Sequence, residues 1–291
     1  MKKNKSIQRK KRKNIFINIF MFMMYALMYI PIAVMVVFSF NDTKKNIIWQ
    51  SFTWKWYPKL FQFSNHDLWD ALSYSIIIAI LATLISVTIG VLGGIGLKKF
   101  KFKGKKFINM MLYVPIVVPE IVLAVAALII FMTIGIKLGL GTILIGHCTF
   151  CIPYAVVTIK GRISGDNETL QEASMDLGAN RFQTFFKVTI PSIMPGIMSS
   201  AFLAFTLSID DVIVSNMLSG ASRSTLPVLI LSMNRTGITP DVNALTTVML
   251  IVMLIGMFTI NFFQKRKVKK EQKQIEEDNK RILAAKLAVD R

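Results

Sequence analysis

The chain alternates between long apolar runs and short polar segments. Six of the runs are long enough to cross a bilayer core of about 30 Å, which takes about 20 helical residues. They cover residues 15–40, 71–97, 107–134, 138–159, 190–213 and 242–263. The fourth run is the least regular, because three glycines and Pro153 interrupt it. The pattern predicts an all-α polytopic membrane protein with six transmembrane helices.

Basic residues lie mainly in alternate segments between these runs. Of the 35 Lys and Arg residues, 28 lie in the segments 1–14, 98–106, 160–187 and 264–291. Cytoplasmic loops of membrane proteins are enriched in Lys and Arg, so this distribution predicts that both termini are cytoplasmic. The predicted organisation is a basic tail at 1–14, a six-span domain at 15–263 and a charged tail at 264–291.

The composition agrees with a membrane protein and disfavours other classes. The chain is 53% hydrophobic yet has a net charge of +19, which suits a polytopic protein with basic cytoplasmic ends. We expect the basic tails to contact anionic lipid headgroups in the bilayer. Nucleic-acid binding is not indicated, because no aromatic or Gly-rich segment accompanies the charge. The first apolar run is too long for a signal peptide and lacks a small-residue cleavage site.

Three acidic residues lie in or near the apolar runs: Glu120, Asp210 and Asp211. A charge at the bilayer centre costs about 2.5 to 3.5 kcal/mol even on the gentler insertion scale, so these residues should not face lipid. Counting from Phe107 places Glu120 roughly 20 Å along the third helix. Asp210 and Asp211 fall late in the fifth span, towards the outer side. Together the acids predict a path for a cation.

Pro115 and Pro119 directly precede Glu120 and are expected to break or kink the third helix. A broken helix is tolerated within a membrane where it lines a cavity or is covered by protein, which favours an internal cavity at Glu120. The alternative is structural: the acids cap helices or pair with a base such as Arg223 or Arg235.

Other residue patterns in the sequence do not indicate a metal, cofactor or catalytic site. His147, Cys148 and Cys151 lack a fourth ligand, so we expect helix packing and no metal site. Glycines of the second run suit close helix packing: Gly90, Gly93, Gly94 and Gly96. No Walker A sequence occurs, so we expect no ATP or other cofactor on this chain. No hydrolase motif occurs either, and we expect a protein that is not an enzyme.

A polar segment between the fourth and fifth runs contains Glu172-Ala-Ser-Met-Asp-Leu-Gly178. Four residues recur at the spacing of one helix face and form a modest apolar surface: Leu170, Ala173, Ser174 and Leu177. We expect this helix to begin at Glu168 with Asn167 as its cap, and Gly178 to take the left-handed turn that ends it. A second short helix then follows from Arg181.

This spacing resembles the EAA loop of ATP-binding cassette importer permeases, in which Glu-Ala-Ala is followed by Gly and later by Ile-x-Leu-Pro. Glu172, Ala173, Gly178 and Pro191 fall in register, whereas Ser174 replaces the second Ala. Val and Ile also replace the Ile and Leu before the Pro. In that family the loop, at about 161–189 here, is a cytoplasmic coupling helix that docks onto an ATPase.

The resemblance implies a type I importer permease architecture. It assigns an ATPase-coupling surface to Glu172, Ala173, Ser174, Leu177, Gly178 and Pro191. The implied partners are a second permease subunit, two ATPase subunits that hold ATP and Mg, and an extracytoplasmic solute-binding protein.

Aromatic residues cluster in the first outer loop, where they anchor the chain at the membrane interface or contact the solute-binding protein. The candidates for that contact are Trp49, Trp54, Trp56 and Tyr57. The run 49–57, the stretch 113–122 and the segment from Ser208-Ile-Asp-Asp211 to residue 245 resemble spermidine/putrescine permeases of the bacterial inner membrane. The resemblance covers nearly all of the chain between the first and sixth spans.

The resemblance implies a small polycation as the substrate. Spaced carboxylates with aromatic surface between them suit such a cation. The predicted pathway residues are Glu120, Asp210, Asp211, Tyr113 and Tyr154. The alternatives are an importer for an amino acid, thiamine or ferric ion, a secondary transporter that acts alone, and a membrane subunit without a pathway. The EAA-like loop argues against the second of these.

Overall fold

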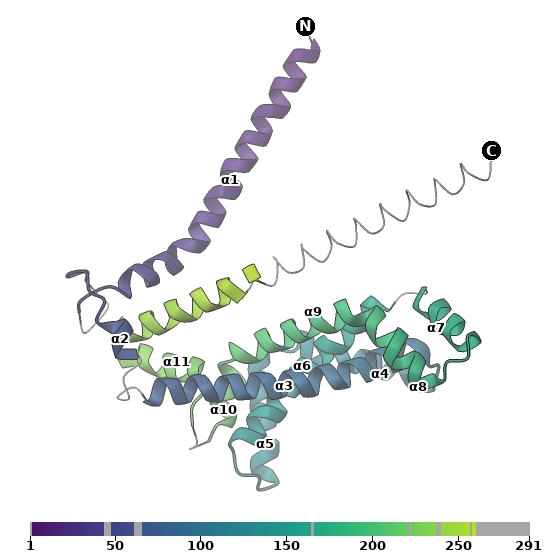
Figure 1. Cartoon of the computed structure of the whole chain (residues 1–291). Coiled ribbons are helices and arrows are strands. Elements are labelled where there is room, and N and C mark those ends of the chain that lie inside the picture. The colour runs from purple at the N-terminus through teal and green to yellow at the C-terminus, as the bar shows by residue number, and fades with distance from the viewer. Residues whose placement is uncertain are drawn as a thin grey trace. The chain divides into compact units, whose positions relative to one another are not determined.

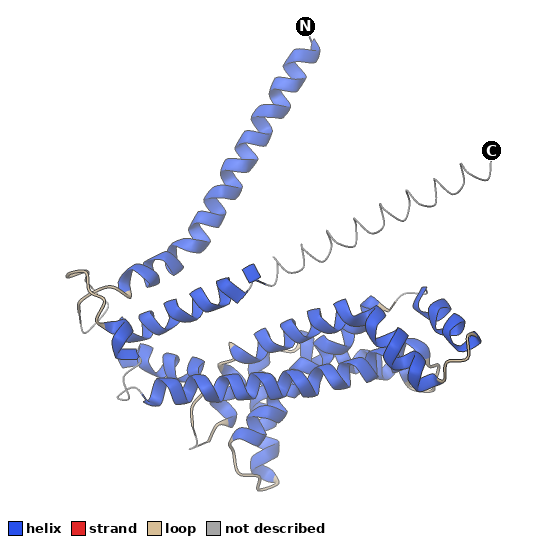
Figure 2. Ribbon diagram, viewed as in Figure 1, coloured by secondary structure: helices blue, strands red, loops and turns tan. Residues whose placement is uncertain are grey.

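The structure is a computed structural model that describes residues 2–43, 48–60, 66–163, 166–220, 223–236, 240–256 and 258–259. Within these ranges the chain is helical, apart from loops and one isolated bridge between Asn41 and Phe52 (Figure 2). The all-α prediction is therefore confirmed for the described residues. The predicted C-terminal tail at 264–291 lies outside them.

The helices in chain order are α1 (Lys2–Phe38), α2 (Trp56–Leu60), α3 (His66–Lys99), α4 (Lys105–Val117), α5 (Glu120–Thr133), α6 (Leu140–Arg162), α7 (Asp166–Asp176), α8 (Arg181–Thr184), α9 (Ile190–Ile209), α10 (Ile213–Leu218) and α11 (Leu226–Thr236). A π-helical turn at Phe185–Thr189 joins α8 to α9, and a last apolar helix covers Pro240–Gly256. The chain forms two compact units, residues 63–236 and residues 1–62 with 237–291.

Long apolar helices account for most of the predicted spans. Four segments in the described part are long and apolar enough to cross a membrane: Ile17–Phe38, Asp67–Lys99, Leu140–Arg162 and Arg181–Ile209. The number rises to five if α4 and α5 together form one span. The described helix Pro240–Gly256 is shorter, and the predicted sixth span continues beyond it into residues that the structure does not fully describe.

The third predicted span is two helices, bent by 106° between α4 and α5. Val118, which precedes Pro119, is extended with φ −71° and ψ 135°, as a residue before proline prefers. The predicted break is thus confirmed, but Glu120 does not lie roughly 20 Å along one straight helix as predicted. A rise of 1.5 Å per residue applies only along a straight helix, and Glu120 starts a new one.

The fifth predicted span also differs at both ends. The helix starts at Arg181 and runs through the π-helical turn into α9, so Pro191 lies inside a continuous segment. At the other end α9 stops at Ile209, and α10 begins at Ile213. Asp210 and Asp211 therefore lie in the corner between α9 and α10, and not within the span as predicted.

Helices α3, α6 and α9 pack against one another at the centre of the unit of residues 63–236 (Figure 1). A Cβ atom at Gly90 of α3 would lie 2.6 Å from the Cβ of Ala155 in α6, and one at Gly94 would lie 3.2 Å from Cγ2 of Ile159. The predicted small-residue face is confirmed at these positions, whereas a Cβ at Gly96 has no neighbour within 4 Å. Small residues allow the close helix approach that membrane bundles use.

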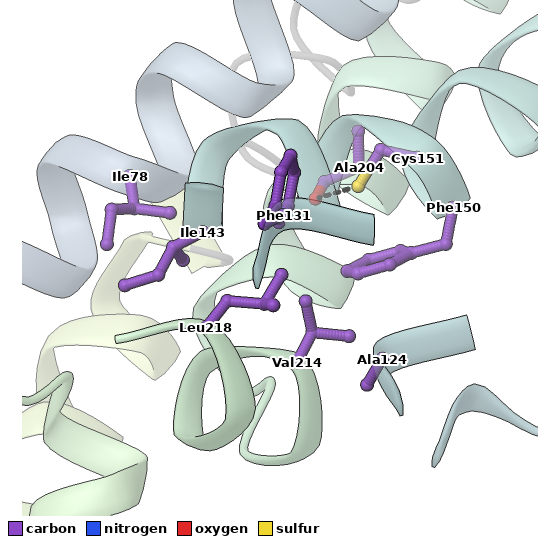
Figure 3. Close-up of a cluster of buried hydrophobic side chains, with 9 residues drawn as sticks. All are labelled: Ile78, Ala124, Phe131, Ile143, Phe150, Cys151, Ala204, Val214 and Leu218. Carbon is purple, nitrogen blue, oxygen red and sulfur yellow. Dashed lines mark hydrogen bonds between the residues drawn. The ribbon is translucent and has the colours of Figure 1, made fainter. Parts of the chain in front are cut away.

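An apolar core forms where five helices of this unit meet. Its buried side chains come from α3, α5, α6, α9 and α10 and are Ile78, Ala124, Phe131, Ile143, Phe150, Cys151, Ala204, Val214 and Leu218 (Figure 3). The Cys151 thiol lies 3.6 Å from the carbonyl oxygen of Ala204. This packing holds α5 and α10, because helices this short are marginal without tertiary contacts.

We predict that Gly90→Ala destabilises the protein and that Gly96→Ala does not. Both changes add the same methyl group to α3, and both gain up to about 1 kcal/mol of helix propensity. Only the first forces α3 and α6 apart, at a cost of about 1 to 3 kcal/mol for overpacking. Thermal unfolding of the purified variants measures the difference. Equal midpoints for the two variants would contradict the packing described here.

Candidate functional site

Four of the five predicted pathway residues meet at one cavity of about 480 Å³ in the unit of residues 63–236: Glu120, Tyr154, Asp210 and Asp211. The charged residues among its described lining are all acidic. Phe150 and Leu207 supply apolar surface beside them. Tyr113, the fifth predicted residue, lies on α4 with half of its surface exposed and is outside this lining.

The bend between α4 and α5 places Glu120 at the cavity. Glu120 is the first residue of α5, where free backbone N–H groups and the helix dipole favour a negative charge. Its side chain lines the same cavity as those of Asp210 and Asp211. The kink predicted from Pro115 and Pro119 therefore places the first turn of α5, with Glu120, at the cavity.

Asp210 and Asp211 differ in their surroundings although they are adjacent in the sequence. Asp210 caps the C-terminus of α9 and is exposed. Asp211 is only 6% exposed and accepts hydrogen bonds from the backbone N–H groups of Val214 (3.2 Å) and Ser215 (2.7 Å) at the start of α10. The alternative role considered above, a helix cap, thus applies to Asp211.

The side-chain partner of Asp211 is His147 of α6, which the sequence did not indicate. Nε2 of His147 lies 3.1 Å from Oδ2 of Asp211, and the imidazole is fully buried. Among the described residues Asp211 pairs with His147 and not with Arg223, which was considered above as an alternative partner, and the side chain of Arg235 lies outside the described residues. A histidine inside an otherwise apolar run was the available signal, since a buried imidazole needs polar partners.

The predicted coupling segment forms a helix–turn–helix. Gly178 follows α7 with φ +89°, a conformation that suits glycine, and the N–H of Ala179 donates to the carbonyl of Ser174 at 3.1 Å. Asn180 then caps α8 through reciprocal hydrogen bonds with Gln183 of 2.9 and 3.0 Å. The glycine turn is confirmed. The first helix begins at Asp166, so residue 167 lies inside it and not before it as predicted.

The surface of this segment is rich in exposed apolar side chains. Leu177 is 90% exposed and Phe182 is 78% exposed, and Glu172 and Ala173 are exposed on α7. Ser174 turns inward instead, with its hydroxyl 3.2 Å from that of Thr184. Pro191 lies two residues into α9. Exposed apolar surfaces of this kind often mark sites of protein–protein interaction.

Lys99 at the end of α3 donates to Oε1 of Gln171 in α7 at 3.0 Å. This bond ties the coupling segment to the bundle. A groove of about 760 Å³ lies between the end of α3 and this segment, with Glu172 and Arg181 in its lining.

The aromatic loop belongs to the other unit, residues 1–62 with 237–291. Trp54 packs against Phe40 and Tyr57, with ring centroids 4.8 and 5.6 Å apart. Trp56 is 8% exposed and its Nε1 donates to the carbonyl of Asn41 at 2.8 Å, so it holds the loop from within. Trp49 and Trp54 remain 43% and 61% exposed, and Phe52 beside them is 59% exposed.

Comparison with known proteins places the chain among transport components. Residues 86–271 match the family described as "Binding-protein-dependent transport system inner membrane component". The "Spermidine/putrescine transport system permease protein PotC" of Haemophilus influenzae is 41% identical over 237 residues, which cover 81% of this chain and 91% of that protein.

Two further relatives come from Escherichia coli K12. The protein of the same name is 39% identical over 250 residues, covering 86% of this chain and 94% of its own length. The "Putrescine transport system permease protein PotI" is 32% identical over 260 residues, covering 86% of this chain and 92% of its own length.

Solved structures support the same fold. A chain of an amino acid ABC transporter crystallised with histidines has a TM-score of 0.55 at 17% identity, covering 72% of this chain and 98% of its own. A chain of the inward-facing MetNI methionine ABC transporter has a TM-score of 0.51 at 18% identity, covering 70% of this chain and 94% of its own. At these identities the likeness concerns the fold alone.

We predict that Asp211→Asn lowers the stability of the protein much more than Asp210→Asn. The first change removes the charge that accepts two backbone N–H groups and an imidazole, at a cost of about 2 kcal/mol. The second changes an exposed side chain and should stay within about 0.5 kcal/mol. Thermal unfolding of both variants in detergent measures this, and equal losses would contradict the capping role of Asp211.

Proposed function

Because the chain belongs to the family of binding-protein-dependent transport system inner membrane components, we propose that it is a permease subunit of an ATP-driven importer of small polycations such as spermidine and putrescine. The observation that carries the substrate class is the cavity in which every charged residue of the described lining is acidic. The names of the relatives, which are permeases of spermidine/putrescine and putrescine transport systems, support the same substrate class.

The chemistry of the cavity suits a polyamine better than an amino acid. A polyamine carries ammonium groups separated by short methylene chains, and it has no carboxylate that would need a basic partner. Glu120 and Asp210 supply exposed carboxylates, and Phe150 and Tyr154 supply apolar and aromatic surface beside them. A cation over an aromatic face gains about 0.5 to 2 kcal/mol. Such contacts allow weak binding and release along a path.

We further propose six spans in a bacterial inner membrane, with both termini in the cytoplasm. The distribution of Lys and Arg supports this orientation. The helix Pro240–Gly256 would belong to the sixth span together with the residues that follow it. The chain would form half of the pathway beside a second permease subunit. Lipid would cover the remaining apolar surface, which includes most of the segment Ile17–Phe38.

The coupling segment α7–α8 is proposed to dock onto one of two ATPase subunits, which would bind ATP and Mg. Its exposed Leu177 and Phe182 suit insertion into a cleft of such a partner. From Arg181 the chain is helical without interruption to Ile209, a length of 29 residues or about 40 Å. A displacement of the coupling segment would therefore be transmitted along α9 to Asp210 at its end.

The π-helical turn at Phe185–Thr189 lies within this connection. Turns of this kind often mark functional sites in helices.

We propose that an external solute-binding protein delivers the polyamine and contacts Trp49 and Trp54, with Tyr57 and the buried Trp56 holding these rings in place.

We predict that Glu120→Gln and Asp210→Asn each lower polyamine transport by about tenfold. Each change keeps the shape of the side chain and removes the charge that would attract an ammonium group, and a hydrogen bond to a charged group contributes about 1.5 kcal/mol. The measurement is the initial uptake of labelled spermidine and putrescine by proteoliposomes that contain the complete importer, with saturating binding protein and ATP.

Assembly of these variants is checked by gel filtration. Wild-type uptake in both variants, with assembly intact, would remove the two acids from the pathway. If the wild-type importer moves neither polyamine, the proposed substrate class is wrong.

We predict that Gly178→Pro and Glu172→Lys uncouple transport from ATP hydrolysis while membrane insertion stays normal. Proline cannot take the positive φ of Gly178, so the turn between α7 and α8 must change. Glu172→Lys reverses a charge on the exposed surface of α7. The measurement is ATPase activity in response to loaded binding protein. A normal response in both variants would show that this segment does not couple the subunits.

A further inference from the structure

A buried polar cluster behind the acidic cavity connects three helical elements. At its centre is His147 of α6, with no exposed surface. Its Nδ1 lies 2.6 Å from Oγ of Ser208 in α9, and its Nε2 lies 3.0 Å from Oγ of Ser215 in α10. The same Nε2 lies 3.1 Å from Oδ2 of Asp211 in the corner between α9 and α10. One imidazole therefore contacts both sides of the corner that carries the acids.

The hydrogen-bonding capacity of Asp211 is largely used inside the protein. Oδ1 accepts from the N–H of Val214, and Oδ2 accepts from the N–H of Ser215 and from His147. An ionised carboxylate has about four acceptor positions, so three of them are filled by fixed donors. Since a carboxylate can only accept, the hydrogen of the imidazole lies on Nε2, between the ring and Asp211.

The other two acids of the cavity differ from Asp211 in their exposure. Glu120 and Asp210 are exposed at the cavity, whereas Asp211 is 6% exposed. A cation that approaches the cavity therefore meets two accessible carboxylates and one whose oxygens are already bonded. Their spacing depends on the position of the α9–α10 corner, because Asp210 directly follows the last residue of α9 and directly precedes Asp211.

Two further contacts are consistent with a rigid corner. Oγ1 of Thr142 in α6 donates to the carbonyl oxygen of Leu218 at 2.9 Å, so α6 holds α10 at both ends. Gly146, one residue before His147, lets α10 approach closely, because a Cβ there would lie 2.6 Å from Val214.

We propose that His147 is a positioning residue of this cavity, which fixes the α9–α10 corner and commits Asp211 to the protein interior, so that Glu120 and Asp210 are the carboxylates that bind the cation. This deepens the proposed function and rests on it for the identity of the cation. His147 itself does not touch the substrate. Its role is to set the distance between two carboxylates, and hence the length of diamine or triamine that spans them.

Three substitutions at His147 separate this role from simple packing. His147→Gln keeps an N–H donor near the position of Nε2 and should retain the bond to Asp211. His147→Asn places its amide near the position of Nδ1, so it can bond to Ser208, but Asp211 loses its side-chain partner and keeps only the two backbone donors. His147→Leu fills the space but removes both bonds. Thr149→Val is the matched control, because the exposed hydroxyl of Thr149 bonds to the carbonyl of Ile145 in the same helix and, within the described residues, to no other helix.

The first measurement does not depend on the substrate. Amide hydrogen exchange of α10 in the assembled importer should increase about tenfold or more in His147→Asn and His147→Leu, as expected when a hydrogen bond to a charged group is lost. Exchange in His147→Gln and Thr149→Val should stay close to wild type. Unchanged exchange of α10 in His147→Leu would overturn the proposal, whatever the importer transports.

The second measurement is the ratio of the maximal uptake rates for putrescine and spermidine at saturating loaded binding protein. A variant that only folds less well lowers both rates by the same factor and leaves the ratio unchanged. Displacement of the α9–α10 corner changes the distance between the two carboxylates and should change the ratio of the two uptake rates by about threefold or more, because misplacement of binding groups by about 1 Å lowers rates strongly. We expect this change in His147→Asn and His147→Leu, with rescue in His147→Gln. An unchanged ratio, or failure of the glutamine to rescue it, would overturn the proposal.

The two proposals can fail separately. If the wild-type importer transports neither polyamine, the proposed substrate is wrong, while the exchange measurement still decides whether His147 holds the corner. If transport is normal in the wild type and the variants at Glu120 and Asp210 are impaired, but His147→Leu behaves as wild type, only the positioning role is wrong.

Discussion

The cost of placing ionisable groups in an apolar bundle governs the arrangement of this protein. A carboxylate cannot remain buried without donors, and Asp211 obtains them from the start of α10 and from His147. These bonds join α6, α9 and α10 at one point. The acidic residues Asp210 and Asp211 of the cavity therefore lie at the same corner whose packing supplies the donors for the buried charge of Asp211.

Close packing makes this arrangement possible. Gly90 lets α3 approach α6, and Gly146 lets α10 approach α6, so that polar groups on different helices come within hydrogen-bonding distance. The same bundle holds α5 through Ala124 and Phe131 in the apolar core (Figure 3). A substitution that widens one of these contacts would consequently affect the polar cluster as well as the stability of the bundle.

The coupling segment and the cavity are connected by one continuous helix. The chain leaves the glycine turn at Gly178, enters α8 and remains helical to Ile209, where Asp210 follows. A helix transmits displacement along its axis better than a loop, because its backbone hydrogen bonds resist stretching. If the proposed docking to an ATPase is correct, the acid at the end of α9 would respond directly to movement at the other end.

Several features of the fold and the candidate site could be predicted from the sequence because they depend on local chemistry. Apolar runs of sufficient length predicted the long helices, and the proline before Glu120 predicted the break of the third span, since proline removes a backbone donor. Gly178 predicted the turn of the coupling segment because only a few residues accept its positive φ.

The tertiary structure decided which residues act together. Periodicity along a single helix does not reveal its neighbours, so the pairing of His147 with Asp211 was missed, and only arginines were considered as partners of the aspartates. The angle between α4 and α5 was equally inaccessible, because a proline permits a bend without setting its size. Burial separated Asp211 from Asp210, and Trp56 from Trp54, although the members of each pair look equivalent in sequence. Those distinctions arise from contacts between elements, which only the packed chain creates.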